Sequence, residues 1–379
     1  MKILHAVAYY PPHRVGGIGE VAKHLHHGLL AQGHDSVVLT SGSSENDPLI
    51  MRIAVSPFKY VTSLGKYAKL AKKFDVVHCH QGETIALPFM MKLRRIKTPF
   101  LMTFHVGSRG MAHACRPYNL DGKTFRTGWK GWLYRNITAR CHQFTNWLAL
   151  RIADETSFIS RSSAKDNLGA AKAVTANIDH NGVGGEIIDK NGISPEPADI
   201  LYVGNNSHRK RVMALPFLLK YIRQSIPKAR LRMIGVDMKS IPELTRLLDE
   251  FNLKGAVVCE GVLASSNEIN PYYRASKVLV VPSVYEGLPM VILEALQNSL
   301  PCVVTRVSGH PEVIQDGING FLVEKDNPEQ MANRCIEILR NDQLQKRMGE
   351  ASRQFIDKKF DNTRMVSRYM NLYSRMCKQ

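Results

Sequence analysis

The chain has 379 residues, 44% of them hydrophobic, and a formal net charge of +18. Its length exceeds one ordinary core and predicts two domains of similar size. No apolar run reaches the roughly 18 residues that span a bilayer, and the apolar start at residues 1–8 runs into prolines and glycines, which indicates a strand rather than a signal peptide. Seven cysteines without a Cys-x-x-Cys pair argue against a disulfide framework and favour a reducing cytoplasm.

The positive charge is concentrated in the first half of the chain. Residues 1–190 hold 25 Lys and Arg against 13 Asp and Glu, and residues 52–140 hold 17 against three. A basic field of this kind attracts polyanions such as membrane lipids, phosphorylated acceptors or nucleic acid. A solubilising surface would show the same excess. No recognised nucleic-acid-binding module is visible, so nucleic acid is not expected as a partner.

Strands and helices are predicted to alternate through the first half. Apolar periodicity predicts strands at 3–9, 36–40, 75–80, 99–104, 155–159 and 173–178, and helices at 18–31, 61–73, 84–95 and 128–150. Residues 107–127 are rich in Gly, Arg, Asn and Pro and should be irregular. The turn at 181–185 and the segment 192–199 mark a linker.

The same alternation returns from residue 200 to about 340, and a last helix is expected at about 360–376. Alternation of this sort predicts parallel sheets covered by helices on both faces. In such folds ligands bind at the carboxyl ends of the strands.

The segment from Pro282 to Ala295 sets two carboxylates, Glu286 and Glu294, around a predicted helix start. Pro289 suits the first helical position, and free N–H groups beside it would face an anion such as a diphosphate. Glu294 would lie about 8 Å further along the axis, so the two carboxylates could grip separate sets of hydroxyls. A solvated surface helix with two ordinary glutamates is the alternative.

Short motifs follow one another through the second half in a fixed order. They are Ile200-Leu201-Tyr202-Val203-Gly204, Arg209-Lys210, Met233-Ile234-Gly235, Gly261-Val262, residues 278–283, Gly309-His310-Pro311-Glu312 and residues 316–323. In order and spacing they resemble a family 4 retaining glycosyltransferase, of the glycosyl transferases group 1. The resemblance covers most of the chain.

The resemblance implies the GT-B fold, in which two Rossmann-like α/β domains have parallel sheets that face across a cleft. We expect an acceptor-binding domain at 1–190 and a nucleotide-sugar-binding domain at 191–355. Residues 356–379 would form a C-terminal helix that packs back on the first domain.

The resemblance also assigns roles in the second domain. Glu294 would bind the ribose hydroxyls, and Glu286 the donor sugar together with Gly287, Leu288 and Pro289. Gly261 and Val262 would form the base pocket, and Lys210 and Arg209 would hold the diphosphate. The family usually places an Arg directly after the glycine of Tyr-Val-Gly, but this chain has Asn205 there. One phosphate-binding cation is therefore missing, which puts the donor pose or catalytic efficiency in doubt.

Two features of the first domain are candidates for the same site. Gly16 and Gly17 lie in a glycine-rich loop between strand and helix, where backbone N–H groups can approach a diphosphate. A tight turn would explain them equally well. His105 follows a predicted strand end and matches a family histidine that faces the reacting sugar, but a packed histidine is the alternative.

Histidines are unevenly distributed, with 12 of the 14 in residues 1–190. His24, His26 and His27 form one group and His78 and His80 another, which raises the question of a metal site. We expect none, because the first group lies on a helix that should expose its histidines and the resemblance implies metal-independent transfer.

Together these features predict a retaining glycosyltransferase that needs no metal or cofactor. It would move a sugar from a UDP- or GDP-sugar to a saccharide or lipid-linked acceptor of the cell envelope, in polysaccharide or lipopolysaccharide biosynthesis. Two alternatives stay open. An impaired GT-B scaffold could bind polyanions or membranes through its basic surface, or the fold could serve a nucleotide-sugar epimerase or phosphorylase.

Residues 92–140 are the predicted contact with anionic membrane, on the inner face of the cell membrane. Cations and interfacial aromatics would provide the contact. These are Lys92, Arg94, Arg95, Lys97, Arg109, Arg116, Lys123, Arg126, Lys130, Arg135 and Arg140, with Phe125, Trp129, Trp132 and Tyr134. The alternative is that Trp129 and Trp132 pack into the domain.

Overall fold

The computed structural model describes residues 1–11, 16–41, 47–53, 67–126, 128–184, 195–263 and 266–378. The chain divides into two compact units. The first comprises Met1–Gly110, Ile137–Gly184 and Phe360–Gln379, and the second comprises Met111–Asn136 and Gly185–Lys359.

A six-stranded parallel sheet forms the centre of the first unit, in the order β3-β2-β1-β4-β5-β8. Its strands are β1 (Lys2–Val7), β2 (Asp35–Ser41), β3 (Ile50–Ile53), β4 (Val76–His80), β5 (Phe100–Phe104) and β8 (Glu155–Phe158). The strand order reverses between β1 and β4, and ligands of doubly wound sheets bind at such a reversal.

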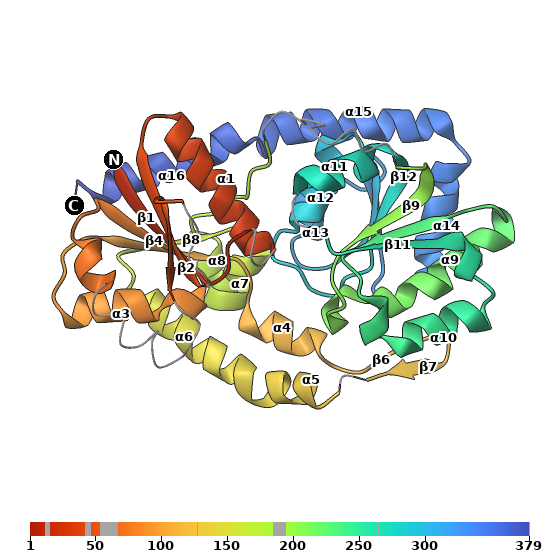
Figure 1. The fold of residues 1–379 in the computed structure, drawn as a ribbon, viewed down its shortest axis with the longest axis horizontal. Helices are drawn as coiled ribbons and strands as arrows, with labels where there is room; N and C mark the ends of the chain where they lie inside the picture. Colours follow the sequence, from red (N-terminus) through yellow and green to blue (C-terminus); the bar gives the residue numbers. More distant parts are fainter. Residues whose placement is uncertain are drawn as a thin grey trace. The chain divides into compact units, whose positions relative to one another are not determined.

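Helices cover this sheet (Figure 1). They are α1 (Gly17–Ala31), α3 (Ala86–Leu93), α6 (Ala139–Ile152), α7 (Arg161–Leu168), α8 (Ala170–Ala173) and α16 (Asn362–Met376), with a 3₁₀ turn at Gly82–Thr84. The predicted C-terminal helix is confirmed as α16, which packs on α1 of the same unit. Gly28 allows that approach, because an added Cβ would lie 2.4 Å from Val366.

The second unit contains another six-stranded parallel sheet, ordered β11-β10-β9-β12-β13-β14. Its strands are β9 (Ala198–Val203), β10 (Leu231–Ile234), β11 (Val257–Gly261), β12 (Ser276–Val281), β13 (Cys302–Thr305) and β14 (Gly320–Val323). Its helices are α5 (Trp129–Leu133), α9 (Leu215–Ser225), α10 (Pro242–Glu250), α11 (Ser266–Arg274), α12 (Met290–Gln297), α13 (His310–Val313), α14 (Pro328–Leu339) and α15 (Asp342–Lys359). Short 3₁₀ turns lie at His208–Lys210, Val212–Ala214, Met238–Ser240 and Lys254–Ala256.

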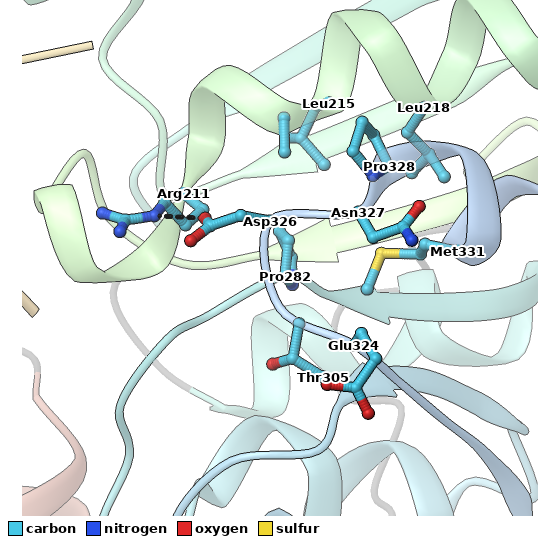
Figure 2. A pocket seen from close by; sticks show the side chains of 11 residues that line it. Arg211, Leu215, Leu218, Pro282, Thr305, Glu324, Asp326, Asn327, Pro328 and Met331 are labelled. Carbon is cyan, nitrogen blue, oxygen red and sulfur yellow. Dashed lines mark hydrogen bonds and ion pairs between the residues drawn. The ribbon is translucent and has the colours of Figure 1, made fainter. Parts of the chain in front are cut away.

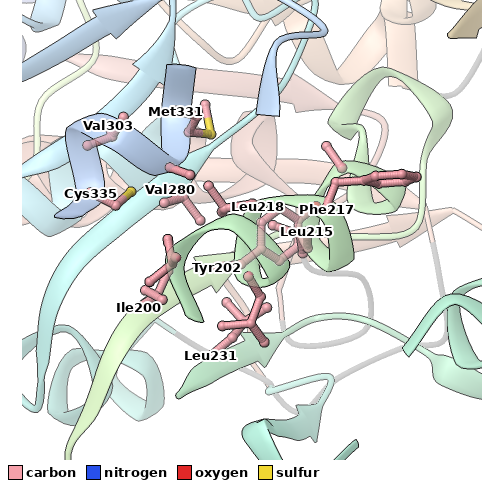
Figure 3. Packing of buried hydrophobic residues seen from close by; sticks show 14 of the residues in the cluster. Ile200, Tyr202, Leu215, Phe217, Leu218, Leu231, Val280, Val303, Met331 and Cys335 are labelled. Atoms are coloured by element: carbon pink, nitrogen blue, oxygen red, sulfur yellow. The ribbon is translucent and has the colours of Figure 1, made fainter. Parts of the chain in front are cut away.

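The core of the second unit forms where α9 and α14 pack together over the sheet (Figure 3). Leu215 and Leu218 of α9 meet Met331 and Cys335 of α14, and all four side chains are buried. Their spacings of three and four residues place them on one face of each helix. This packing fixes the carboxyl ends of the strands that carry the candidate site.

Residues 111–136 group with the second unit, although the boundary expected near residue 190 would leave them with the first domain. The segment is more ordered than predicted, with α4 (Ser108–Ala114) followed by the hairpin β6 (Tyr118–Leu120) and β7 (Lys123–Phe125). Tyr118 and Phe125 are buried in the core of the second unit. The Arg211 guanidinium lies 3.4 Å from the Tyr118 ring centroid. This cation–π contact attaches the hairpin to the segment that precedes α9.

The long helix predicted at 128–150 is present as α5, a π-helical turn at Tyr134–Thr138 and α6. The strand predicted at 173–178 is wrong. Residues 170–173 are helical, and within residues 174–178 only Ile178 makes a bridge, to Phe158. Alanine is the strongest helix former, so the run Ala-Ala-Lys-Ala overrides the weaker strand signal.

Candidate functional site

The loop before α12 is fixed by a close backbone contact. The N–H of Gly309 faces the carbonyl of Glu286 at 3.4 Å, and a Cβ at Gly309 would lie only 1.9 Å from the Gly287 oxygen. Only glycine fits at residue 309 without moving the loop. Helix α12 begins at Met290, so Pro289 is the residue before the helix and not its first residue as predicted. Leu288 and Met290 on either side of it are buried.

Glu286 forms a buried ion triad with two consecutive cations. Its Oε2 lies 2.6 Å from Arg209 Nη1, and its Oε1 lies 2.7 Å from Lys210 Nζ. Burial alone would raise the pKa of Glu286, but Arg209 and Lys210 outweigh burial and hold it well below its usual range. The carboxylate is therefore ionised at neutral pH. One negative charge between two positive ones leaves a net positive charge beside the start of α12.

The backbone holds the two cations in place. The Val284 N–H donates to the Arg209 carbonyl at 2.9 Å, and the Arg209 guanidinium donates to the Tyr285 carbonyl at 3.2 Å. Burial lowers the pKa of Lys210, and the attraction of Glu286 only partly offsets it. Two predicted phosphate-binding residues and a predicted sugar-binding residue thus form one cluster.

Asn205 has a local structural role. Its side-chain Oδ1 accepts the Ser207 N–H at 3.1 Å, an Asx turn that leads into the 3₁₀ turn holding Arg209 and Lys210. The residue is exposed. The cation that the family places here is absent, and Arg209 is the second cation paired to Glu286.

Glu294 lies in the second turn of α12 and is buried. Its Oε2 accepts a 2.9 Å hydrogen bond from the Tyr273 hydroxyl of α11. Burial, and then Glu294, raise the pKa of Tyr273 well above its usual range, so the phenol stays a donor. Sequence reasoning missed Tyr273, because one tyrosine in a helix has no distinctive pattern.

Three glycines line the carboxyl ends of β9, β10 and β11. The Gly235 N–H donates to the Gly261 carbonyl, and both residues have positive φ, of 84° and 72°. A Cβ at Gly235 would lie 2.9 Å from the Gly204 oxygen, so glycine is required there. Val262 follows and is 71% exposed. The carboxyl ends of these strands thus present glycine backbone and one exposed apolar side chain, that of Val262.

His310 is a site residue to which the sequence reasoning gave no role, although it stands in the Gly-His-Pro-Glu motif. Its Nδ1 donates to the Thr305 carbonyl at 2.7 Å, so Nε2 carries the lone pair. Burial lowers the pKa of His310 to about 4, with partial compensation from Glu286. Nε2 is buried and finds no partner among the described residues. His310 Nε2 can therefore accept a hydrogen bond near the ion triad.

A small cavity lies behind the ends of β12, β13 and β14, between Thr305, Glu324 and the Arg211–Asp326 ion pair of 2.8 Å (Figure 2). Its volume is about 10 Å³, enough for one water and too small for a sugar. It is a structural gap and not the donor site.

In the first unit, Gly16 precedes α1 in an extended conformation, with φ −173° and ψ 148°. A Cβ at Gly16 would meet nothing within 4 Å, whereas one at Gly19 would lie 2.7 Å from the Tyr9 oxygen. Packing therefore demands glycine at residue 19 and not at 16. Gly17 is the first residue of α1. Residues 12–15 of the predicted loop lie outside the described residues.

His105 follows β5 and is buried. Gln81, which sequence reasoning also missed, holds its backbone. The Gln81 Oε1 accepts the N–H groups of His105 and Val106 at 2.9 and 3.1 Å, and its Nε2 donates to the Val106 carbonyl at 3.1 Å. Gln81 itself has φ 70° and ψ 154°, a region nearly confined to glycine. Strain of this kind is concentrated at functional sites.

Buried histidines surround His105. His5, His78 and His80 lie on β1 and β4, and their ring nitrogens are close enough to be metal ligands. The rings of His78 and His80, however, are stacked at 4.1 Å with an interplanar angle of 28°, so their in-plane lone pairs run side by side rather than converging. His78 also bonds Tyr373 and Thr103 through its two nitrogens. The arrangement fits a hydrogen-bonded network better than a metal site.

The other histidine group differs from expectation. His26 on α1 is buried and bonds the Ser36 hydroxyl at 2.7 Å, so the prediction that this helix exposes its histidines is wrong for His26. Burial also lowers the pKa of His26 to about 4.

The predicted membrane-binding residues divide between the two units. Trp129 and Trp132 are 70% and 55% exposed, which rules out the alternative that they pack inside. Phe125 is only 4% exposed, and its predicted role as an interfacial aromatic is wrong because it fills the second core. Lys123 pairs with Glu250. The side chains of Arg109, Lys130, Tyr134 and Arg135 lie outside the description.

Sequence reasoning missed the most regular exposed surface, on α6. Phe144 and Trp147 of α6 are 60% and 47% exposed and three residues apart, so they lie on one helix face, and Ile137 in the π-helical turn before α6 is 49% exposed. Arg140 and Arg151 are exposed on the same face, with the Arg151 guanidinium 3.9 Å from the Trp147 ring centroid. No helix in the described part of the chain has the length and apolar character needed to cross a membrane.

Two family models match the chain. The glycosyl transferase 4-like domain matches residues 16–166, and glycosyl transferases group 1 matches residues 185–355. The chain belongs to the family 4 glycosyltransferases. An uncharacterized glycosyltransferase of Methanocaldococcus jannaschii is 26% identical to this glycosyltransferase over 371 residues, which cover 88% of this chain and 87% of the relative.

Solved structures confirm that the glycosyltransferase has the GT-B fold. Sucrose-phosphate synthase from Thermosynechococcus elongatus matches with a TM-score of 0.77 and 19% identity, covering 99% of this chain and 98% of that one. The structure of Anabaena HepE in complex with UDP-glucose matches with a TM-score of 0.76 and 16% identity, covering 99% and 100%. At these identities the likeness shows the fold alone.

Proposed function

We propose that this glycosyltransferase transfers a sugar from a nucleoside diphosphate sugar to a saccharide or lipid-linked acceptor of the cell envelope, with retention of configuration. The observation that carries the proposal is the buried triad of Glu286, Arg209 and Lys210 beside the start of α12. Its net positive charge and the free N–H groups of the helix start suit a diphosphate.

The chemistry follows from the position of the charges. The donor C1–O bond to the β-phosphate breaks, and the phosphate gains negative charge that Arg209 and Lys210 neutralise. The acceptor hydroxyl attacks C1 on the face that the phosphate leaves, and its proton passes to the departing phosphate oxygen. The reacting sugar passes through an oxocarbenium-like state, and no protein nucleophile is assigned. The site needs no resident metal, because the two cations provide the neutralising charge.

Other site residues bind the rest of the donor. Glu294, with one oxygen held by Tyr273, accepts hydrogen bonds from the ribose hydroxyls. The open backbone at Gly261 and the exposed Val262 receive the base. His105 bonds the reacting sugar from the first unit, and Gly16 and Gly17 let the diphosphate approach the start of α1. The UDP-glucose bound in the HepE structure supports UDP-sugars as the first donors to try.

We further propose that the protein binds anionic membrane reversibly through α6 and the π-helical turn before it. Ile137, Phe144 and Trp147 suit the headgroup level, and Arg140 and Arg151 suit anionic lipid. Residues 137–152 contain no Asp or Glu, so nothing on this helix repels an anionic surface. Binding there would hold the enzyme at the inner face of the membrane, beside a lipid-linked acceptor.

An impaired scaffold that only binds polyanions is less well supported. Such a protein needs exposed cations, whereas Arg209 and Lys210 are mostly buried and paired with Glu286. An epimerase or phosphorylase would use the same donor-binding residues, so the products must decide.

The test incubates the enzyme with radiolabelled UDP- and GDP-sugars, with and without lipid-linked and soluble acceptors. Transfer to an acceptor with the anomeric configuration of the donor, read by NMR of the product, supports the proposal. A free epimer, a sugar phosphate or an inverted product would overturn it.

A further inference from the structure

Three histidines form a continuous chain that ends at His105. Nδ1 of His5 lies 3.3 Å from Nε2 of His80, and Nδ1 of His80 lies 3.2 Å from Nε2 of His105. They come from β1, from β4 and from just after β5, three neighbouring strands of one sheet. All three rings are buried, with at most 2% exposed.

All three rings are neutral at the pH of a cell. Burial lowers the pKa of His5 and of His105 to about 3, and that of His80 well below its usual range. A neutral imidazole has one N–H donor and one acceptor nitrogen. Each contact in the chain needs one of each, so the protonated nitrogens of the three rings are coupled. Only two arrangements of the ring protons satisfy both contacts. In one, each ring donates to the next from His5 towards His105, and in the other each ring donates in the opposite direction.

The His5 end of this row of histidines distinguishes the two arrangements. Nε2 of His5 is buried and has no hydrogen-bond partner among the described residues. If the chain ran back from His105, this nitrogen would carry an orphaned N–H. If it runs from His5, the nitrogen carries only an unused lone pair. Orphaned buried N–H groups are the rarer case in proteins, which favours the direction from His5.

We propose that His5 and His80 are positioning residues that hold His105 as the Nδ1–H tautomer. His5 donates from Nδ1 to His80, and His80 donates from Nδ1 to Nε2 of His105. The His105 ring then has Nδ1–H as its donor for an oxygen of the reacting sugar. This inference deepens the proposed function and rests on it for the role of His105, but the tautomer is a property of the protein alone.

His78 provides a matched comparison. Its ring is as deeply buried and stacks on His80, yet its nitrogens bond the Tyr373 hydroxyl at 2.6 Å and the Thr103 hydroxyl at 2.8 Å. Tyr373→Phe therefore removes a buried hydrogen bond from the same cluster without touching the chain to His105.

The experiment reads the tautomer of His105 by two-bond ¹H–¹⁵N correlation NMR on protein labelled at histidine, with His105→Gln to assign the signal. The expected wild-type pattern shows a protonated Nδ1. In His80→Phe the pattern should shift towards Nε2–H, and kcat should fall about tenfold at little changed donor KM, the effect of one lost hydrogen bond. His80→Gln, which can donate and accept, should recover part of kcat. Tyr373→Phe should change neither the tautomer nor kcat.

The outcomes are separable. A wild-type His105 protonated at Nε2, or an unchanged tautomer in His80→Phe, would overturn the inference whether or not the protein transfers sugar. The shift without any transferase activity would leave the inference standing and count against the proposed function. If His80→Phe does not fold, the wild-type pattern alone decides, because a His105 protonated at Nε2 overturns the inference. Bound metal in the purified protein that is lost in His5→Leu would also refute the hydrogen-bonded chain.

Discussion

Tyr273 and Glu294 are joined by a 2.9 Å hydrogen bond from the phenol hydroxyl to carboxylate Oε2. The bond links α11 to α12 and orients a buried carboxylate. An ionised carboxylate can accept several hydrogen bonds, so the bond from Tyr273 alone does not exhaust its capacity. This oriented carboxylate is the group that we propose for the ribose hydroxyls.

Glu294→Ala should weaken nucleotide binding by roughly tenfold to a hundredfold, because a hydrogen bond to a charged group is worth about 1.5 to 3 kcal/mol. Tyr273→Phe should weaken it less, since the carboxylate remains but loses its orientation. Isothermal titration with the preferred nucleotide measures both. Equal affinities for wild type and Glu294→Ala would remove Glu294 from the site.

Glu286→Gln should lower kcat more than it raises the Kd for the nucleotide. The variant keeps the shape of Glu286 but leaves Arg209 and Lys210 without their buried counter-charge. Truncation to alanine should destabilise the fold by about 3 to 5 kcal/mol, the cost of leaving buried charge unpaired. Steady-state kinetics and denaturant unfolding separate the two effects. Normal kcat in a folded Glu286→Gln would contradict the assignment.

Lys210→Ala should reduce kcat more than Arg209→Ala does, because Lys210 holds the position that the family uses for phosphate. Charge on the leaving phosphate grows as the bond breaks, so the loss should appear in kcat rather than KM. Each variant removes one cation from the same triad, so each serves as the control for the other. If Arg209→Ala reduced kcat more than Lys210→Ala, Arg209 would be the main phosphate ligand. Arg209 would then take the role of the arginine that is missing at residue 205.

Stability should fall as the pH drops below about 6.5. The folded pKa values of His5 and His105, about 3, lie below the unfolded value near 6.5. Between these values the unfolded chain binds protons that the folded protein does not, so acid favours unfolding by about 1.4 kcal/mol per pH unit for each such histidine. Melting temperatures between pH 7 and 5 test this, and His5→Leu should show a shallower slope. A flat profile would mean that the rings are solvated.

Membrane binding should depend on the exposed face of α6. The double change Phe144→Ser with Trp147→Ser should abolish sedimentation with anionic vesicles at low salt, and Arg140→Glu with Arg151→Glu should weaken it about tenfold or more. Ile318→Ser removes an equally exposed apolar side chain from the second unit and is the control. Recovery that is the same on neutral and anionic vesicles would exclude this surface.

The fold could be read from the sequence because long apolar periodic segments decide it. The strands before and after α1 and the C-terminal helix appeared close to their predicted positions, and the alternation expected from residue 200 is present in the second unit. The hairpin at Tyr118–Leu120 and Lys123–Phe125 could not be foreseen, because its two three-residue strands are stabilised by distant contacts with Arg211 and Phe217. The π-helical turn between α5 and α6 also has no periodic signal.

Site residues that belong to a known motif could be predicted from the sequence. Site residues that are positioned only by the fold could not. The glutamates and the cation pair were assigned through the resemblance of their motifs to a known family, but the ion triad that joins Glu286 to Arg209 and Lys210 was not foreseen. Tyr273 and Gln81 act through one or two hydrogen bonds that only the fold creates. For Gln81 the missing information was its backbone conformation, with φ 70°, which no sequence pattern records.

The most direct test of the account is a thermal-shift screen of the wild-type protein and Glu294→Ala with UDP, GDP, ADP and their sugars. A ligand that binds only the folded state must stabilise it, by about 2.7 kcal/mol at a hundred times its Kd. We predict that the nucleotides of one base, and their sugars, raise the wild-type melting temperature, and that Glu294→Ala largely loses the shift. No shift with any of these ligands, or an equal shift in the variant, would contradict it.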